Sequence, residues 1–198
     1  MARSNEGDNL GAIQDFSEAI RLKPDYANAF HNRGLARFNE GDNQGAIQDF
    51  NEAIRLRPDY AGFFNNRGIT RNNDADNQGA IQDFSEAIRL TPDYAEAFYN
   101  RGVARFNEGD NQGAILDYSE AIRVKPDYAE AFNNRGFALR AEGDNQGAIQ
   151  DYNEAIRLKP DFALAFGNRG VAREAEGDNQ GAEQDYEKAQ QLRTGSRT

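Results

Sequence analysis

The sequence predicts an all-α protein, a solenoid of stacked antiparallel helix pairs. Three observations carry this prediction: a motif that recurs every 34 residues, two stretches of helical periodicity within each repeat, and turn residues between them. The clearest motif is Asn-Arg-Gly, which begins at Asn32, Asn66, Asn100, Asn134 and Asn168. A fixed period of this length indicates a repeat architecture in which each unit covers the apolar face of the next.

The repeats divide the chain into full units and one partial unit. Counted from the alanine after each Pro-Asp-aromatic motif, the full units are 27–60, 61–94, 95–128, 129–162 and 163–198. Residues 1–26 are a partial unit that consists mainly of a second helix. In the last unit, Glu183 and Gln190 replace the isoleucines of earlier units, as a polar C-terminal cap requires. We expect one continuous solenoid domain.

The first helix of each unit has start and stop signals. An aspartate follows each proline and can cap the helix N-terminus, for example Asp59 and Asp127. A glutamate three residues later, such as Glu130, would complete a capping box. A glycine such as Gly41 can end the helix in the left-handed conformation. Ala75 replaces this glycine in the second full unit, where we expect the loosest helix end.

The second helix begins after a further aspartate and ends before proline. In the first full unit, Asp42 can cap it and Pro58 stops it. Apolar residues recur between them at helical spacing: Ala46, Ile47, Phe50, Ala53, Ile54 and Leu56. Each unit is therefore predicted to be a helical hairpin.

This pattern resembles the tetratricopeptide repeat, which has a large aromatic at unit position 4, Gly at 8, Ala at 20, an aromatic at 24, Ala at 27 and Pro at 32. The first full unit matches at Phe30, Gly34, Ala46, Phe50, Ala53 and Pro58. The match recurs over nearly the whole chain. The resemblance implies a right-handed superhelix whose first helices line a concave groove for a segment of another protein.

Two arginine columns depart from the family pattern, at unit positions 7 and 11. Arg33 and Arg37 would face the second helix, and like charges four residues apart repel. We expect the aspartate that recurs on the second helix to pair with them, at Asp49, Asp83, Asp117, Asp151 and Asp185. Phosphate binding by the arginines is the alternative, and it is disfavoured because the aspartates recur in step.

The predicted groove contains two regular columns and several variable positions. The first column is the asparagine ladder at Asn32, Asn66, Asn100, Asn134 and Asn168. The second column is apolar, at Leu35, Ile69, Val103, Phe137 and Val171. Variable positions add His31, Tyr99, Phe38 and Phe106. Carboxamides match the N–H and C=O groups of a peptide, and the apolar column would accept its side chains.

An alternative interpretation of these columns is purely structural: the asparagines would bond to neighbouring helices, and the apolar residues would pack between first helices. The primary prediction is a non-catalytic scaffold for protein–protein interaction that binds a peptide or a helical segment. A regulatory fragment of a larger enzyme is a further alternative.

Composition limits the other classes of function. The net charge of −10 disfavours binding to nucleic acid, whose phosphates are also negative. No motif for a catalytic site, a cofactor or a metal is found, and neither a cysteine nor a second histidine is available to build one. The opening residues carry no apolar signal segment, and no stretch is apolar enough for membrane insertion, so we expect a cytoplasmic protein, with an extracytoplasmic location left open.

The start of the chain carries an apolar face without its expected cover. The partial unit lacks most of a first helix, which would leave Ala12, Ile13, Phe16, Ala19 and Ile20 exposed. An exposed patch of this kind usually marks a contact. Either upstream residues were trimmed, or a second copy covers the face in a homodimer.

Overall fold

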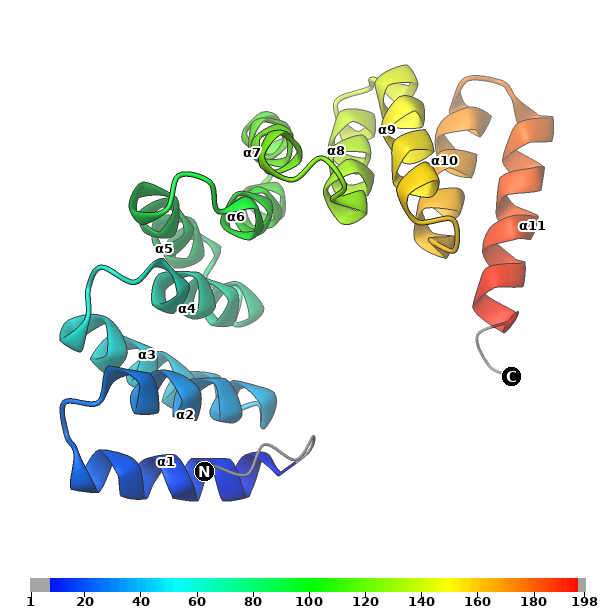
Figure 1. The fold of residues 1–198 in the computed structure, drawn as a ribbon. Helices are drawn as coiled ribbons and strands as arrows, with labels where there is room; N and C mark the ends of the chain where they lie inside the picture. The colour runs from blue at the N-terminus through cyan, green and yellow to red at the C-terminus, as the bar shows by residue number, and fades with distance from the viewer. Residues whose placement is uncertain (1–7, 196–198) are drawn as a thin grey trace. The chain divides into compact units, whose positions relative to one another are not determined.

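The computed structural model describes residues 8–195, which form eleven α-helices and no strand (Figure 1). The helices are α1 (Asn9–Leu22), α2 (Ala27–Asn39), α3 (Asn43–Leu56), α4 (Ala61–Asn73), α5 (Asn77–Leu90), α6 (Ala95–Asn107), α7 (Asn111–Val124), α8 (Ala129–Ala141), α9 (Asn145–Leu158), α10 (Ala163–Ala175) and α11 (Asn179–Gly195). The predicted all-α fold of paired antiparallel helices is confirmed. None of the described helices combines the length and apolar character needed to cross a membrane.

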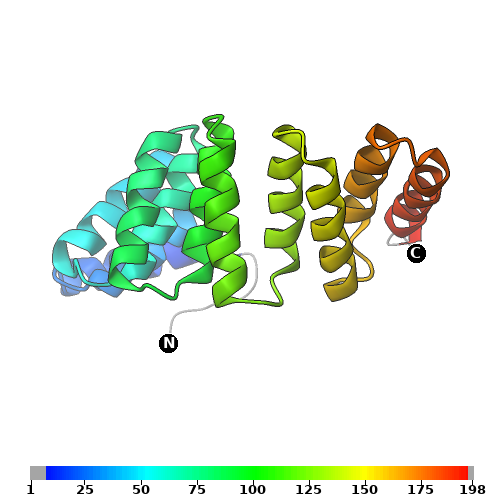
Figure 2. The same cartoon turned by 90° about the horizontal axis from the view of Figure 1, so that it is seen from above.

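The chain divides into two compact units, and the division falls within α6, between Asn100 and Arg101. In the first unit, α2 packs along α3, α4 packs along α5, and α1 lies against α2. In the second unit, α8 pairs with α9 and α10 pairs with α11. Figure 2 shows α9, α10 and α11, coloured yellow to red, side by side, and α10 contacts both of the others.

The aspartate that precedes each second helix, such as Asp42 or Asp144, caps that helix as predicted. The Asp42 carboxylate accepts a hydrogen bond from the Gly45 backbone N–H at 2.9 Å, and the same bond joins Asp144 to Gly147 at 2.8 Å. A Cβ atom on Gly45 would fall within the Asp42 carboxylate. Glycine at this position leaves room for the carboxylate as it is placed here, at a helix-propensity cost of about 1 kcal/mol relative to alanine.

The predicted caps of the first helices are wrong. The N-cap residue of α4 is Tyr60 rather than Asp59, that of α8 is Tyr128 rather than Asp127, and neither makes a side-chain cap bond. The Pro-Asp turn delays the helix by one residue, which puts the aspartate too far upstream to reach the first free N–H groups. The capping box of Glu130 therefore has no capping aspartate to complete it.

The turn between the two helices of a hairpin needs a left-handed residue. Gly41 and Gly143 have φ of 82° and 88°, as predicted from their helix-end position. Ala75 has φ of 61° and is the one non-glycine residue in this conformation within the described chain. The left-handed region costs a residue with a Cβ roughly 1–2 kcal/mol.

Each hairpin core is an aromatic ring of the second helix seated on a glycine of the first. Phe50 is fully buried, and a Cβ on Gly34 would lie 2.8 Å from its Cε1 atom. Ala46 and Ala53 flank the ring and are also fully buried. The close approach of α2 to α3 therefore depends on the absence of a side chain at Gly34.

Candidate functional site

Arginine–aspartate clusters hold the first helix against the second on the side away from the asparagine ladder. Arg33 forms a two-pronged pair with Asp49, with its Nε 2.9 Å from Oδ2 and its Nη2 2.6 Å from Oδ1. Arg37 adds a third contact, from Nη1 to Oδ2 at 3.0 Å. The Asp49 side chain is only 3% exposed, so the two arginines replace the water that would otherwise stabilise its charge. The predicted pairing is confirmed, and both guanidinium groups are engaged in it.

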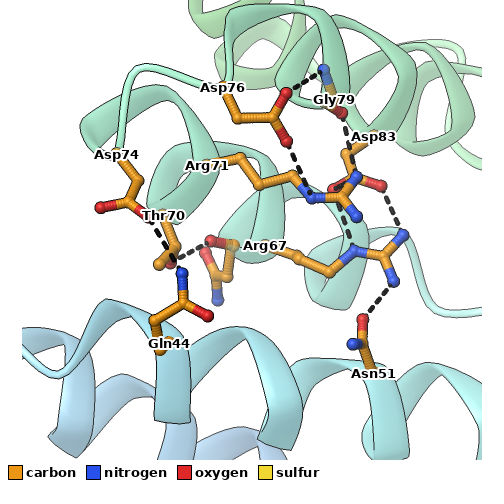
Figure 3. Close-up of polar contacts among 10 residues, drawn as sticks. Gln44, Asn51, Arg67, Thr70, Arg71, Asp74, Asp76, Gly79 and Asp83 are labelled. Atoms are coloured by element: carbon orange, nitrogen blue, oxygen red, sulfur yellow. Dashed lines mark hydrogen bonds and ion pairs between the residues drawn. The ribbon is translucent and has the colours of Figure 1, made fainter.

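The cluster also bonds to the preceding hairpin, a contact that was not predicted from the sequence. In Figure 3, Arg67 and Arg71 converge on Asp83, and Arg67 extends to Asn51 of α3. The Arg67 Nη1 donates to Asn51 Oδ1 at 2.7 Å. Arg169 makes the same bond to Asn153 of α9 at 2.6 Å. A Ser or Asn recurs one residue after the buried aromatic of the second helices, and this recurrence was the sequence signal for the contact.

Some asparagines of the ladder form hydrogen bonds within the chain. Asn100 donates its Nδ2 hydrogen to Asn65 Oδ1 at 3.1 Å, and Asn168 donates to Asn133 Oδ1 at 3.0 Å. Each bond connects a first helix to the first helix of the preceding hairpin. The structural alternative therefore accounts for one amide hydrogen of each residue, and the carbonyl oxygens of Asn100 and Asn168 can still accept from a ligand.

The other ladder positions differ in their partners, and among them Asn66 bonds to the preceding first helix in the same way. Asn66 Nδ2 lies 2.7 Å from His31 Nε2. Since an amide nitrogen only donates, this contact requires a neutral His31 ring. Asn134 accepts from Asn133 at 3.0 Å, and Asn32 is exposed.

His31 lies in an aromatic cluster, half-buried at the junction of two hairpins. Its ring centroid is 4.9 Å from that of Phe63 and 5.8 Å from that of Phe50. Burial lowers the pKa of His31, and the nearby Arg57 cation lowers it further, while a hydrogen bond with Asn32 opposes the shift. His31 is thus a packing residue of the hairpin junction.

The apolar column differs between the two compact units. In the first unit, Leu35 and Ile69 are half-buried. In the second unit, Val103 is also half-buried, whereas Phe137 and Val171 are exposed by 36% and 41%. The second unit therefore presents more apolar surface on its first helices.

Two hollows in the second unit coincide with predicted groove residues. The larger, of about 500 Å³, is lined by Leu164, Gly167, Asn168, Val171, Tyr186, Ala189, Gln190 and Arg193. The smaller, of about 200 Å³, is lined by Val103, Phe106, Asn107, Tyr118, Asn134 and Phe137. Phe106 and Phe137 pack edge to face in it, with ring centroids 5.3 Å apart. Both are small apolar recesses with an asparagine at the wall.

The remaining predicted residues lie outside these hollows. Phe38 and Tyr99 are half-buried on α2 and α6. The predicted oligomer face on α1 is half-buried at every position: Ala12, Ile13, Phe16, Ala19 and Ile20. Within residues 8–195, no group of three acidic or histidine side chains is placed to hold a metal ion.

Comparison with known families identifies the repeat. A family model described as TPR repeat matches residues 5–41, 76–109, 104–139 and 138–177, and one described as tetratricopeptide repeat matches residues 27–60. The chain belongs to the tetratricopeptide repeat family. Family membership favours a protein-interaction scaffold over catalysis. Among curated proteins, no sequence matches this tetratricopeptide repeat chain.

Solved structures share the tetratricopeptide fold. MamA is 27% identical, with a TM-score of 0.77 over 82% of this chain and 95% of that chain. YrrB, described as a TPR protein with an unusual peptide-binding site, is 20% identical, with a TM-score of 0.74 over 91% and 93% of the two chains. MamA 41-end from Desulfovibrio magneticus RS-1 is 19% identical, with a TM-score of 0.79 over 87% and 97%.

Proposed function

We propose that this chain is a non-catalytic scaffold that binds a segment of another protein along the first helices of its second unit. The observation that carries the proposal is the coincidence of exposed apolar side chains with hollows: Phe137 lines the smaller hollow, and Leu164 and Val171 line the larger. Small recesses with exposed apolar walls are typical of sites that anchor a ligand side chain. The description of YrrB as peptide-binding agrees with this assignment.

The chemistry of the recesses favours a ligand with apolar anchors. Leu164 and Val171 provide the apolar wall of the larger recess, and Asn168 provides a polar group beside them. One Nδ2 hydrogen of Asn168 is donated to Asn133, and the Asn168 carbonyl oxygen can accept a hydrogen bond from a peptide N–H. The ligand is therefore expected to place Leu, Phe or Met in the recess and to donate a backbone hydrogen bond.

A peptide-display screen followed by affinity measurement tests this function. We expect Val171→Glu to weaken the best peptides by about tenfold or more, because a carboxylate in the recess would lose hydration. The matched control is Leu116→Gln, which removes an apolar residue that is 67% exposed on the second helix α7 and restores the residue of the other repeats. Equal affinity of Val171→Glu and wild type would contradict the proposal.

Self-association through α1 is a second candidate, favoured by the half-buried apolar face of that helix. Phe16 corresponds to Phe50 and Phe84, which are 0% and 1% exposed in complete hairpins. Sedimentation should then show a mass that rises with concentration and a Phe16→Glu variant that stays monomeric. A monomer at every concentration would eliminate this candidate and would leave the peptide scaffold unaffected.

A further inference from the structure

A row of aromatic side chains precedes the first helices, and a basic side chain three residues earlier lies over most of these rings. The cation to ring-centroid distance is 5.4 Å for Lys23 over Tyr26 and 4.3 Å for Arg57 over Tyr60. It is 4.5 Å for Lys125 over Tyr128 and 4.8 Å for Lys159 over Phe162. A cation is attracted to an aromatic face at this distance. The row is therefore a repeated cation–aromatic arrangement.

One position in the row has lost its cation. Thr91 stands three residues before Tyr94, where the other repeats have Lys or Arg. A threonine carries no charge, so the basic partner of Tyr94 is not supplied at this position. The helix α4 departs from the other repeats as well, with Gly62 in its second position where the others have Asn, Glu or Leu.

The hairpin of α8 and α9 shows what these two positions do when both side chains are present. The Lys159 Nζ lies 4.8 Å from the Phe162 ring centroid and 3.1 Å from Glu130 Oε1. Lys159 occupies the unit position of Thr91, and Glu130 occupies that of Gly62. In the hairpin of α8 and α9, an ammonium group therefore lies between an aromatic ring and a carboxylate. In the hairpin of α4 and α5, Thr91 and Gly62 supply neither the ammonium group nor the carboxylate.

A hollow is found at the place of the missing pair. It measures about 240 Å³ and is lined by Asp59, Tyr60, Ala61, Gly62, Thr91 and Tyr94. Two phenol rings and one carboxylate are the groups that bind an organic cation, and Arg57 already lies over Tyr60, which leaves Tyr94 for a second cation. The chain's net charge of −10 adds a favourable long-range field for a cationic ligand.

We propose that this hollow binds the ammonium group of a lysine side chain presented by a partner protein, in the position that Lys159 fills in its own hairpin. The site lies in the first compact unit and shares no lining residue with the recesses assigned to apolar anchors. It supplies a second, charge-selective contact that those recesses lack. Its test uses a small amine, so the outcome is independent of the apolar-anchor proposal.

The experiment is a titration of the full chain followed by NMR of backbone amides, with N-acetyl-lysine methylamide as the probe. We expect weak, saturable shifts at residues 59–62 and 91–94, with dissociation in the millimolar range. The same probe acetylated on its Nε carries no charge and should give no saturable shift. Equal shifts with both probes, or none with either, would overturn the proposal.

Two variants fill the hollow from within. Thr91→Lys should place an ammonium over Tyr94 and weaken the probe by about tenfold or more. The double variant Thr91→Lys and Gly62→Glu recreates the Lys159–Glu130 pair, but a Cβ at Gly62 would lie 2.7 Å from Tyr60 Cε1, so the single variant is the primary test. Undiminished probe binding by a folded Thr91→Lys protein would also overturn the proposal.

Discussion

Helices α1 and α5 have nearly the same sequence and very different surroundings. NLGAIQDFSEAIRL and NQGAIQDFSEAIRL differ only at Leu10 and Gln78. In α5, Ala80, Phe84 and Ala87 are at most 1% exposed, whereas α1 has no buried residue. Within residues 8–195, no helix precedes α1, while α5 has α4 packed along it.

The difference shows that burial in this fold is supplied by the neighbouring hairpin and not by the helix's own residues. An amphipathic helix of this length is marginal in water, and its stability comes from tertiary packing of its apolar face. The apolar face of α1 and the recess lined by α10 and α11 are accordingly surfaces available to another molecule. Two variant pairs test the comparison, and a single variant tests the junction between two hairpins.

The largest expected effect is the removal of the core ring. Phe84→Ala should reduce the free energy of unfolding by about 3–5 kcal/mol, because it leaves a cavity against Gly68. Phe16→Ala, the same change in the half-buried α1, should cost about 1–2 kcal/mol. Denaturant unfolding followed by circular dichroism measures both. Equal costs would break the comparison.

Next in size is the loss of the charged cluster. Asp83→Asn should cost about 1.5–3 kcal/mol, since Arg67 and Arg71 would lose their shared carboxylate. Asp15 occupies the same position in α1 and is exposed, so Asp15→Asn should change stability by less than about 0.5 kcal/mol. The same unfolding assay applies. A large cost at Asp15 would show that the carboxylate at this position contributes to stability even where it is exposed.

The smallest expected effect concerns pH and the junction of two hairpins. The pKa of His31 lies below its ordinary value of 6.5, so the unfolded chain takes up the proton first as pH falls through that value. Stability is therefore complete above pH 6.5 and decreases below it, until the folded state is protonated as well. Protonation also blocks the hydrogen bond from Asn66.

His31→Asn is the matched control for this pH dependence. Asn65 and Asn133 hold the same position in other repeats and accept from Asn100 and Asn168 at 3.1 Å and 3.0 Å. The variant keeps an acceptor at the junction and removes the titration. Thermal unfolding between pH 5 and pH 8 should therefore be flatter for the variant than for wild type. An unchanged slope would assign the pH dependence to other groups.

Much of the framework could be predicted from the sequence because its signals are local. Asp42 caps the second helix, Gly34 admits the Phe50 ring, and Arg33 pairs with Asp49, each within one hairpin. The start of α4 lies one residue later than predicted from Asp59. The preceding turn sets this start, and the helical pattern of apolar residues does not reveal it.

The candidate sites were less predictable because they depend on contacts between different helices. The bond from Asn168 to Asn133 joins residues 35 apart, and a repeated asparagine gives no indication of whether its donor faces a helix or a ligand. The hollow near Tyr94 arises from two differences between repeats, Gly62 and Thr91. Gly62 lies on α4, and Thr91 directly follows the end of α5. Only the folded chain brings them together.

Amide hydrogen exchange on the native protein tests the central claim most directly, since it reports the local stability of each helix. If neighbouring hairpins supply the stability, the amides of α1 exchange much faster than those of α5 despite the nearly identical sequences. Equal protection of the two helices would contradict the account and would mean that the helix sequence itself sets the stability.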